Sequence, residues 1–428
     1  MELKQFEVKG LFNSYDHLVS FPTTSGVAQQ PAIVIIHGRN GVGKTTLLRM
    51  LDGIMRLDFT TFRNVPFSEA KLTFDNKRAL QVKSETADGK LKYLKVSYGK
   101  YQAMLNPNHS GALTEEEQLA VSNFRDEFFR DVVGIAFEYI DIERLSRIKE
   151  ARLSEAQLEA LAMPREYYFS PSGKIVSNGL NIKSKKVRDS SISLDKRVAE
   201  FINSAQINYR QFFSSTEPDL FPKILEKLSG HETVDIEKDK LKSQLRFVID
   251  QDKITERFGL ESDKWDYSQI VSKIDLLDNH PGTKQNSLTI LSVYAEHLAS
   301  RAQERKLVAD RLLTFEKLLS EFFVGKEVRI DSVEGMRIST AGKKPLKESD
   351  LSSGEYHLLY LMVSALVTKQ KGTILAIDEP EMSMHIAWQR KLVSALIRCA
   401  SGAEPLFIFA THSPDLVSSY REAMIDLG

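Results

Sequence analysis

The alternation of apolar and polar residues along the chain predicts an α/β region at its start. Residues 31–38 form an apolar run broken by a glycine, as in a buried strand, and residues 44–55 have helical spacing. Between residues 71 and 101, three segments alternate in polarity around turns, which predicts an antiparallel side sheet. A helix is expected from Thr114, and after it a second buried strand that ends at Arg144.

The middle of the chain has a different pattern. Residues 151–325 are rich in Lys, Glu, Gln and Leu at helical spacing, most clearly over residues 287–323, where no proline or glycine interrupts. Residues 326–428 begin with two paired strands and continue as a compact alternation of helices and strands, which is typical of a parallel α/β sheet. We therefore expect an N-terminal lobe at 1–150, a helical insertion at 151–325 and a C-terminal lobe at 326–428.

Composition restricts the function only weakly. The 58 Lys and Arg residues are balanced by 58 Asp and Glu, so no overall positive field indicates nucleic-acid binding. The single cysteine, Cys399, excludes an internal disulfide and a cysteine-built zinc site, and its place in an apolar helical pattern predicts core packing. No secretory signal or membrane-length apolar run is present, so we expect a cytoplasmic protein that does not contact membranes.

Two local basic clusters lie within the predicted insertion. Residues 183–191 form a short basic run, and the second cluster follows one predicted helix at Arg301, Arg305, Lys306 and Arg311. Such clusters can bind a phosphate backbone. The simpler interpretation is a solvated helix face on which the basic side chains pair with Glu296, Glu304 and Asp310.

The clearest motif is GRNGVGKT at residues 38–45, which fits the pattern G-x-x-x-x-G-K-[ST] between a predicted strand and a predicted helix. In this setting, backbone N–H groups and the helix N-terminus stabilise nucleotide phosphates. We expect Lys44 to reach the β and γ phosphates of ATP and Thr45 to bind Mg²⁺. The residues expected to bind the nucleotide are Gly38, Asn40, Gly41, Gly43, Lys44, Thr45 and Thr46.

Three polar side chains follow apolar strands in the C-terminal lobe. Asp378 ends the apolar run 374–377, where a carboxylate can hold the metal ion of a phosphate-loop NTPase. Glu379 follows immediately and is the best candidate for a general base that activates the attacking water. His412 follows the strand 406–410, where it can bond the γ phosphate. The remaining histidines do not have the spacing of metal ligands, and we assign them no role.

Four motifs occur in the order GRNGVGKT, LSSGE, IDEPE and THSP, and together they resemble the ABC-type ATPases. This resemblance implies an ATPase head with a mixed sheet and an antiparallel side sheet, in which two subunits enclose ATP and Mg²⁺. It implies that Ser352 and Gly354 contact the γ phosphate bound by the partner subunit, and that Ser353 also belongs to the nucleotide-binding residues. Glu379 would be the catalytic base and His412 the switch histidine. Glu355 begins a predicted helix, so its carboxylate can interact with the helix dipole.

The long separation between the phosphate loop and LSSGE indicates which branch of the ABC-type ATPases the chain resembles. Residues 46–350 lie between the phosphate loop and LSSGE, far more than a transporter ATPase requires, and a helical insertion of this kind resembles the SMC, DNA-repair and OLD-type branch. GLFNSYDHLVSF resembles the opening of OLD-like ATPases, and YIDIERL resembles their strand that ends in an arginine, here Arg144. EPEMSMHIAWQRKL resembles a third OLD-like segment, with His385 where transporters usually have an aspartate. The candidates left open are Gln81 and Gln102 for sensing Mg²⁺ and Tyr15 for stacking on adenine.

The resemblance also implies a biological setting. OLD proteins continue into a TOPRIM nuclease, whereas only residues 413–428 follow His412, so no intrinsic nuclease is expected. The layout resembles stand-alone ATPases of bacterial anti-phage defence, the AriA family of PARIS more closely than the PtuA family of Septu. Such a protein would be a homo-oligomeric scaffold and sensor that controls a separately encoded TOPRIM-like or HNH nuclease after a DNA or phage-protein trigger. The alternative is an SMC-like or repair-like ATPase that processes DNA, although the insertion has no CxxC hook.

Overall fold

The computed structural model describes most of the chain, which divides into two compact units. The α/β unit comprises residues 1–191 and 351–428, and the helical unit comprises residues 192–350. The residues that the structure describes are 2–22, 32–87, 90–106, 115–132, 134–142, 167–169, 175–177, 193–229, 237–260, 267–274, 281–332, 335–368 and 372–428. Arg144 and the basic run 183–191 lie outside them, so the roles expected of both stay predictions.

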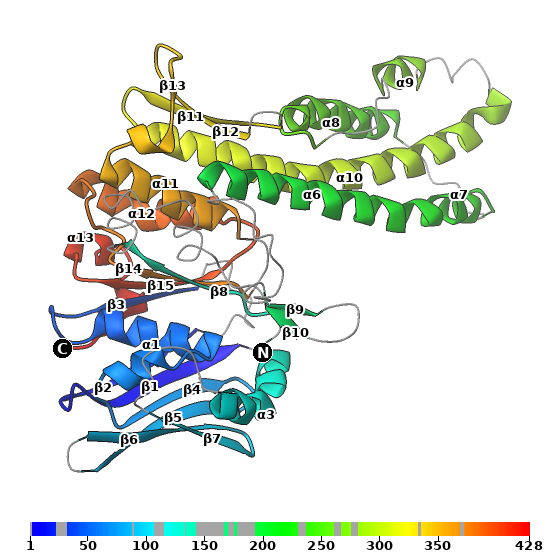
Figure 1. Cartoon of the computed structure of the whole chain (residues 1–428). Helices are drawn as coiled ribbons and strands as arrows, with labels where there is room; N and C mark the ends of the chain where they lie inside the picture. The colour runs from blue at the N-terminus through cyan, green and yellow to red at the C-terminus, as the bar shows by residue number, and fades with distance from the viewer. Residues whose placement is uncertain are drawn as a thin grey trace. The chain divides into compact units, whose positions relative to one another are not determined.

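A five-stranded parallel sheet forms the centre of the α/β unit (Figure 1). The sequence-predicted apolar runs become its buried strands, because both faces of a parallel sheet are covered. The pattern does not predict β16, which has only three residues and pairs with β3. The strand order is β16 (Met424–Asp426), β3 (Ile33–His37), β15 (Leu406–Thr411), β14 (Ile374–Asp378) and β8 (Phe137–Asp141).

Helices cover both faces of this parallel sheet (Figure 1). Helix α1 (Lys44–Arg56) lies against one face, and α11 (Ser353–Leu366) and α12 (Ile386–Cys399) lie against the other. Side chains alternate along a strand, so Ile36 joins the core shared with α1, whereas the buried Ile35 points to the opposite face. The period of two along the apolar strands therefore supplies both helix layers with a surface to pack on.

The N-terminal part of the α/β unit adds an antiparallel sheet, as its alternating segments predict. Its inner face shares one core with α1, and α3 (Glu115–Asp131) packs against its last strand. The strand order is β2 (Tyr15–Ser20), β1 (Leu3–Leu11), β4 (Glu69–Phe74), β5 (Ala79–Ala87), β6 (Lys90–Tyr98) and β7 (Tyr101–Leu105). The unit also contains two short α-helices, α2 (Thr60–Asn64) and α13 (Pro414–Val417), and the 3-10 helix Arg421–Ala423. The predicted fold class, an α/β head with a side sheet and a helical insertion, is confirmed.

The region expected to be helical from residue 151 begins differently. Within residues 151–191 the structure describes two short antiparallel strands, β9 (Tyr167–Phe169) and β10 (Ile175–Ser177). Their sequences, YYF and IVS, consist mainly of aromatic and β-branched residues, which favour strands. The helical prediction is therefore wrong for these two segments, and the described helices of the insertion begin with α6.

The helical unit is built on α10 (Pro281–Phe322), the long helix that the uninterrupted pattern predicts. The other helices are α6 (Leu194–Thr216), α7 (Leu220–Ser229), α8 (Lys238–Glu256) and α9 (Tyr267–Ile274). A small antiparallel sheet contains β11 (Lys326–Asp331), β12 (Gly335–Thr340) and β13 (Pro345–Leu346). The N–H of Met336 on β12 donates to Asp195 Oδ1 of α6 at 2.7 Å. Residues 326–350 thus pack within the helical unit, although the expected lobe boundary at 326 places them with the C-terminal lobe.

The second basic cluster is divided between the interior and the surface of the helical unit. Arg301 and Arg305 are only 6% and 3% exposed. Arg305 forms an ion pair with Asp252 of α8, and Arg301 Nε donates to Tyr209 Oη of α6 at 3.1 Å. Lys306 forms an ion pair one turn further along the helix surface. The solvated-face interpretation therefore holds for Lys306 and is wrong for the two arginines, because partners on other helices bury them.

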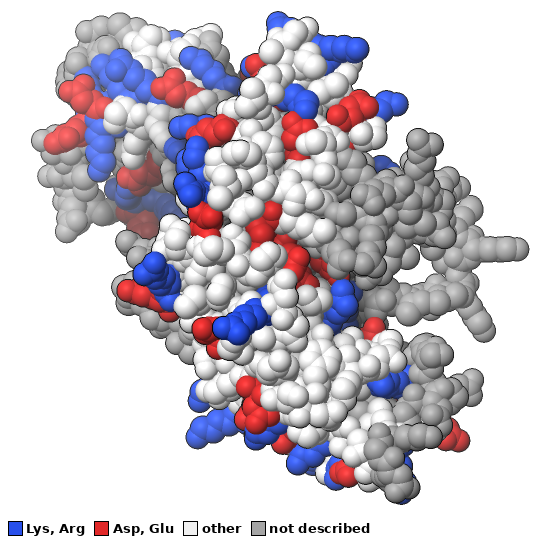
Figure 2. All heavy atoms as spheres, turned by 90° about the vertical axis from the view of Figure 1, so that its left-hand side faces the viewer, with Lys and Arg blue, Asp and Glu red and all other residues white. Residues whose placement is uncertain are grey.

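The charges on one face and the burial of Cys399 bear on the expectations drawn from composition. On the face drawn in Figure 2, the described acidic and basic side chains are intermixed and form no continuous basic area. Cys399 is fully buried, and its Sγ lies 3.7 Å from the carbonyl oxygen of Met362, so the prediction of core packing is confirmed. Within the described parts of the chain, no helix combines the length and the apolar character needed to cross a membrane.

Candidate functional site

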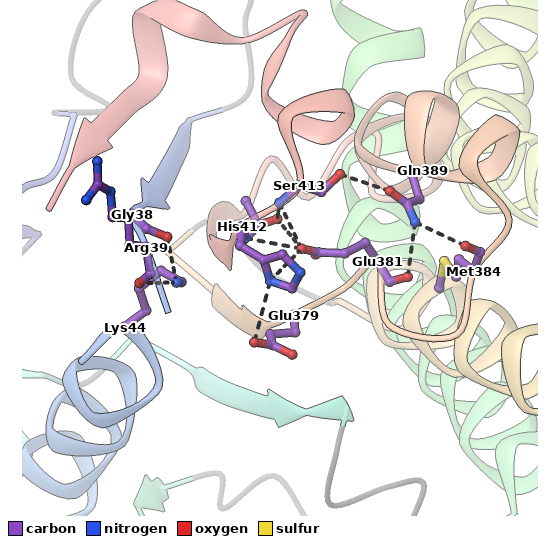
Figure 3. A network of polar contacts seen from close by, with 10 residues as sticks. Gly38, Arg39, Lys44, Glu379, Glu381, Met384, Gln389, His412 and Ser413 are labelled. Carbon is purple, nitrogen blue, oxygen red and sulfur yellow. Dashed lines mark hydrogen bonds and ion pairs between the residues drawn. The ribbon is translucent and has the colours of Figure 1, made fainter. Parts of the chain in front are cut away.

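The phosphate loop connects β3 to α1 and depends on its glycines. Gly43 has a φ of 96°, and a Cβ on it would lie only 2.6 Å from Leu11 Cδ2. The buried Lys44 donates from Nζ to the carbonyl oxygens of Gly38 at 2.8 Å and Arg39 at 3.1 Å (Figure 3). The ammonium group is therefore held within the loop by the loop's own carbonyl groups. The other predicted nucleotide-binding residues lie at the exposed part of the loop, Asn40 and Gly41, and in the first turn of α1, Thr45 and Thr46.

A hairpin outside the motif supports the phosphate loop. His17 on β2 is buried, and its Nε2 lies 2.8 Å from the carbonyl oxygen of Val42, at the centre of the loop. The ring of His17 stacks on Tyr15, with ring centroids 5.7 Å apart and planes inclined by 13°. A lone histidine gives no sequence signal for such a contact. Stacking of Tyr15 on adenine remains a prediction, and in the structure its ring contacts His17.

Asp378 ends β14 and is buried, as a metal-holding carboxylate of this type should be. Its pKa is raised from 3.8 to about 6, mainly because the carboxylate is buried. Polar contacts from Thr45 and Tyr139 lower the pKa, and the nearby carboxylates of Asp141 and Glu379 raise it further. Its Oδ1 is buried and has no hydrogen-bond partner among the described residues. A carboxylate oxygen that has no partner, next to a threonine hydroxyl, fits a hard divalent cation such as Mg²⁺.

Magnesium also fits a position that offers the carboxylate of Asp378 next to the hydroxyl of Thr45. Mg²⁺ usually binds one or two carboxylates and completes its coordination with water and nucleotide phosphates. The pair Thr45 and Asp378 therefore matches the requirement of a metal ion that arrives with its nucleotide.

Two residues of strand β8, Tyr139 and Asp141, make polar contacts at the site that were not predicted from the sequence. Tyr139 donates its hydroxyl to Asp378 Oδ2 at 3.2 Å, and burial raises the pKa of this tyrosine, so it stays a donor. Asp141 lies directly beside Asp378 in the parallel ladder. Its Oδ2 accepts from Arg49 Nη2 of α1 at 2.9 Å. The polar residues within YIDIERL are the available signal in the sequence, where only Arg144 of that segment was assigned a role.

Glu379 and His412 lie close together at the ends of two neighbouring strands (Figure 3). His412 Nδ1 is 3.7 Å from Glu379 Oε1. Glu379 has a positive φ of 49°, uncommon for a residue with a side chain, and its N–H donates to the carbonyl oxygen of Ala410 at 2.8 Å. Both side chains are partly exposed, at 37% for Glu379 and 50% for His412. The structure thus brings the two predicted catalytic side chains to one place, and their roles remain predictions.

Glu381 is a central residue of the site that sequence reasoning missed. Its side chain is 5% exposed, and Oε1 accepts from the hydroxyl of Thr411 and from the N–H groups of His412 at 3.2 Å and Ser413 at 3.1 Å. Oε1 is also 3.7 Å from His412 Nδ1. The second glutamate of IDEPE was visible in the sequence, but nothing in its spacing indicates that it bonds a loop some thirty residues later.

The LSSGE segment begins α11 with a capping box. Ser352 accepts from the N–H of Glu355 at 3.3 Å, and the Glu355 carboxylate accepts from the N–H of Ser352 at 2.8 Å. A Cβ on Gly354 would lie 2.4 Å from the carbonyl oxygen of Ser383, so the loop after β14 packs directly on this glycine. Ser352, Ser353 and Gly354 form the capped start of α11, a helix that lies against the sheet face opposite to the phosphate-loop helix α1 (Figure 1).

The two glutamines considered for sensing Mg²⁺ both lie on the antiparallel side sheet. Gln81 is on β5, where its amide donates to Glu69. Gln102 is an exposed residue of β7, opposite Ser97. The residue that does stand beside Asp378, on the next strand of the parallel sheet, is Asp141. Sensing of Mg²⁺ by either glutamine gains no support from these positions.

Comparison with known protein families gives one match. A family model described as "AAA domain, putative AbiEii toxin, Type IV TA system" matches residues 199–418. The matched range contains Asp378, Glu379 and His412, and the phosphate loop lies before it. A sequence search of curated proteins finds no match.

Three solved structures, all SMC head domains, show low similarity. The Pyrococcus furiosus SMC head with an extended coiled coil, bound to the C-terminal domain of ScpA, has a TM-score of 0.39 and 14% identity over 97% of this chain and 91% of that chain. An SMC head bound to the C-winged helix domain of ScpA has a TM-score of 0.38 and 13% identity, covering 98% and 91%. The Thermotoga maritima SMC head has a TM-score of 0.36 and 12% identity, covering 100% and 94%. Similarity at this level carries no conclusion about activity or partners.

Proposed function

Because the chain belongs to the family of AAA domains described as putative AbiEii toxin of type IV TA systems, we propose that it binds and hydrolyses ATP. The observation that carries the proposal is the buried Asp378, whose Oδ1 has no hydrogen-bond partner among the described residues. The same carboxylate contacts Thr45 at the end of the phosphate loop. A phosphate loop beside a buried carboxylate is the arrangement that a nucleotide and its Mg²⁺ require.

The residues around the loop have separate roles in binding. Thr45 and Asp378 would hold Mg²⁺, which when bound offsets the negative charge of the phosphates. Lys44 would exchange its bonds to the carbonyl groups of Gly38 and Arg39 for bonds to phosphate oxygens. Tyr139 keeps Asp378 in place through its Oδ2, so that Oδ1 stays available.

The residues after β14 and β15 have roles in hydrolysis. Glu379 would accept a proton from the attacking water, since its carboxylate follows the metal-holding Asp378 and is partly exposed. His412, 3.7 Å from Glu379, would donate a hydrogen bond to the γ phosphate. Both side chains stand at the carboxyl ends of parallel strands, where ligands of open α/β sheets bind.

We also infer that two copies of the chain pair around ATP. In one molecule, the capped start of α11 and the helix of the phosphate loop lie against opposite faces of the sheet. Ser352, Ser353 and Gly354 would therefore complete the site of a partner subunit, as the resemblance to ABC-type ATPases implies. Such pairing makes a homo-oligomer the working form.

The biological role that we propose is a scaffold and sensor in anti-phage defence. It would control a separately encoded nuclease, TOPRIM-like or HNH, as in the PARIS system and less closely in Septu. This role is supported by the resemblance of the motifs and by a family description that refers to toxin–antitoxin systems. A role in DNA processing is less well supported, because Arg301 and Arg305, two of the basic residues considered for DNA, are buried.

The test of the ATPase proposal uses two variants with different expected outcomes. Lys44→Ala should weaken ATP binding at least about tenfold, because a buried cationic partner of the phosphates is lost. Glu379→Gln should keep ATP affinity and lower kcat about a hundredfold or more, because the general base is lost. Calorimetric titration with ATP and Mg²⁺ and phosphate release measure the two effects. Glu422→Gln, an exposed carboxylate near the C-terminal strand, is the control. Unchanged hydrolysis in both site variants would overturn the proposal.

A cellular experiment tests the proposed role in defence. The chain is expressed with a neighbouring TOPRIM-like or HNH nuclease gene, and phage plaques are counted for the wild type and for both site variants. We expect the variants to lose protection, and Glu379→Gln to form ATP-dependent dimers in light scattering. Full protection by both variants would contradict an ATP-dependent role.

A further inference from the structure

One buried carboxylate organises the loop that carries His412. Three donors from consecutive residues converge on Glu381 Oε1: the Thr411 hydroxyl and the N–H groups of His412 and Ser413 (Figure 3). Hydrogen bonds to an ionised acceptor are shorter and stronger than those between neutral groups. Residues 411–413 follow β15 directly, so this contact decides how the chain turns as it leaves the sheet.

The His412 side chain has little packing of its own to fix it. It is 50% exposed, whereas Glu381 beneath it is 5% exposed. The position of the imidazole therefore depends on the backbone of His412. Glu381 holds this backbone by accepting from the N–H groups of His412 and Ser413. With the backbone held in this way, His412 Nδ1 lies 3.7 Å from both Glu379 Oε1 and Glu381 Oε1.

A second residue ties the same two loops together from α12. Gln389 Nε2 donates to the carbonyl oxygens of Met384 at 3.0 Å and Glu381 at 3.4 Å. Its Oε1 accepts from the hydroxyl of Ser413 at 2.9 Å (Figure 3). The loop after β14 and the loop after β15 thus share one set of polar contacts. Among these contacts, Glu381 supplies the only charged group.

We propose that Glu381 is a positioning residue, which holds the loop 411–413 so that His412 stays against Glu379. It does not itself touch the nucleotide. Its kinetic consequence rests on the proposed ATPase function, whereas its effect on the loop does not. The proposal accounts for a buried carboxylate whose Oε1 accepts bonds from three consecutive residues of one loop.

The test compares Glu381→Ala with Glu381→Gln. Alanine removes the acceptor of all three bonds, whereas the glutamine amide oxygen can accept the same three. Asp415→Asn is the control, because it removes a neighbouring, partly exposed ion pair with Arg390 and leaves Glu381 intact. Hydrogen–deuterium exchange of peptides that cover residues 406–417 reports the loop, and steady-state ATP hydrolysis with Mg²⁺ reports catalysis. Thermal denaturation verifies that each variant is folded.

We expect faster exchange at residues 412 and 413 in Glu381→Ala, and exchange close to the wild type in Glu381→Gln and Asp415→Asn. For Glu381→Ala, kcat should fall about ten- to a hundredfold while KM for ATP stays within about twofold, because a displaced catalytic group affects the reaction more than binding. Glu381→Gln should restore most of kcat.

Two outcomes would overturn the inference: unchanged exchange at residues 412 and 413 in Glu381→Ala, or faster exchange with kcat and KM unchanged. The inference would also be contradicted if Glu381→Gln changed kcat and KM as much as Glu381→Ala does. Such a result would indicate general damage to the site and not the loss of an acceptor. A wild type that does not hydrolyse ATP would instead refute the proposed function, and the exchange experiment would still decide whether Glu381 holds the loop.

Discussion

The two compact units of this chain bury charged side chains in different ways. In the α/β unit, Lys44, Asp378 and Glu381 lie at or after the ends of parallel strands. Lys44 and Glu381 bond mainly to backbone groups of loops, whereas Asp378 contacts the side chains of Thr45 and Tyr139. In the helical unit, Arg301 and Arg305 lie in the middle of α10 and bond to side chains of other helices. Burial of charge alone therefore does not distinguish a functional site from a structural one.

The partners of the buried charges make the distinction. The two arginines stack on one ring, with guanidinium carbons 5.8 Å and 5.4 Å from the centroid of Tyr209, and Asp252 offsets the charge of Arg305. These contacts stay within the helical unit and need no ligand. Incomplete bonding does not separate the two sites, because Asp378 Oδ1 and the Nε and Nη1 atoms of Arg305 are all buried without a hydrogen-bond partner among the described residues. Asp378 differs in its position, at an edge of the sheet where a phosphate loop begins a helix. The comparison indicates that a buried charge at a strand end beside a phosphate loop is the more informative signal.

The largest effect that would sharpen this comparison is expected from Arg305→Ala. Removing one partner of a buried ion pair is strongly destabilising, so the helical unit should lose about 3 kcal/mol of stability. ATP affinity should not change. Lys306→Ala removes the neighbouring ion pair, which is exposed, and should cost less than about 0.5 kcal/mol. Urea denaturation, monitored by hydrogen exchange of α8, measures the loss of stability in both variants. Equal losses in Arg305→Ala and Lys306→Ala would contradict the assignment of Arg305 to the interior.

An effect of opposite sign is expected from Asp378→Asn. The pKa of Asp378 in the folded protein is about 6, above its ordinary 3.8, so the folded state holds this proton more tightly than the unfolded state. The stability that the proton provides is complete below about pH 4 and is lost as the pH rises through about 6. Asparagine cannot ionise, so the variant should be more stable than the wild type by about 2 kcal/mol at pH 8 and by little at pH 4.

The measurement for Asp378→Asn is denaturation in urea at several pH values without nucleotide, together with titration of Mg²⁺ and ATP. We expect Mg²⁺-dependent ATP binding to weaken in the variant even though the fold becomes more stable. Asp415→Asn, which removes a partly exposed carboxylate, should show neither effect. A variant that is less stable than the wild type at pH 8 would indicate that Asp378 serves the fold and not a ligand.

Most of the fold could be predicted from the sequence, because its elements are long or strongly patterned. The apolar runs before residues 38 and 378, the alternating segments of the side sheet and the uninterrupted pattern of α10 each contain one dominant period. The motifs also identified where Asp378, Glu379 and His412 lie, since strand ends fix such residues at one edge of a sheet. Strands β9, β10 and β16 were not predicted, because three residues are too few to show a period.

The contacts of the site could be predicted far less well, because they join residues far apart in the sequence. Tyr139 bonds Asp378 across 239 positions, and Glu381 bonds Ser413 across 32. No local pattern specifies such pairs. The same limit explains Arg305, whose helical spacing suggested a solvated face, whereas its partner Asp252 lies 53 positions earlier on α8. Periodicity shows which face of a helix is charged, but not which other helix covers it.

The smallest expected effect on stability concerns Glu355, a charged residue that is not buried. Glu355 caps α11 reciprocally with Ser352, at the surface of the α/β unit. Glu355→Ala and Ser352→Ala should each cost about 1 kcal/mol, because each leaves an N–H at the helix start without its acceptor. The double variant should cost clearly less than the sum if the two act as one box. Thermal and urea denaturation of the four proteins measure this coupling, with the exposed Ser353→Ala as the control. Costs that simply add would show that Glu355 acts on the helix dipole alone, so that LSSGE would start α11 without the reciprocal cap seen in the structure.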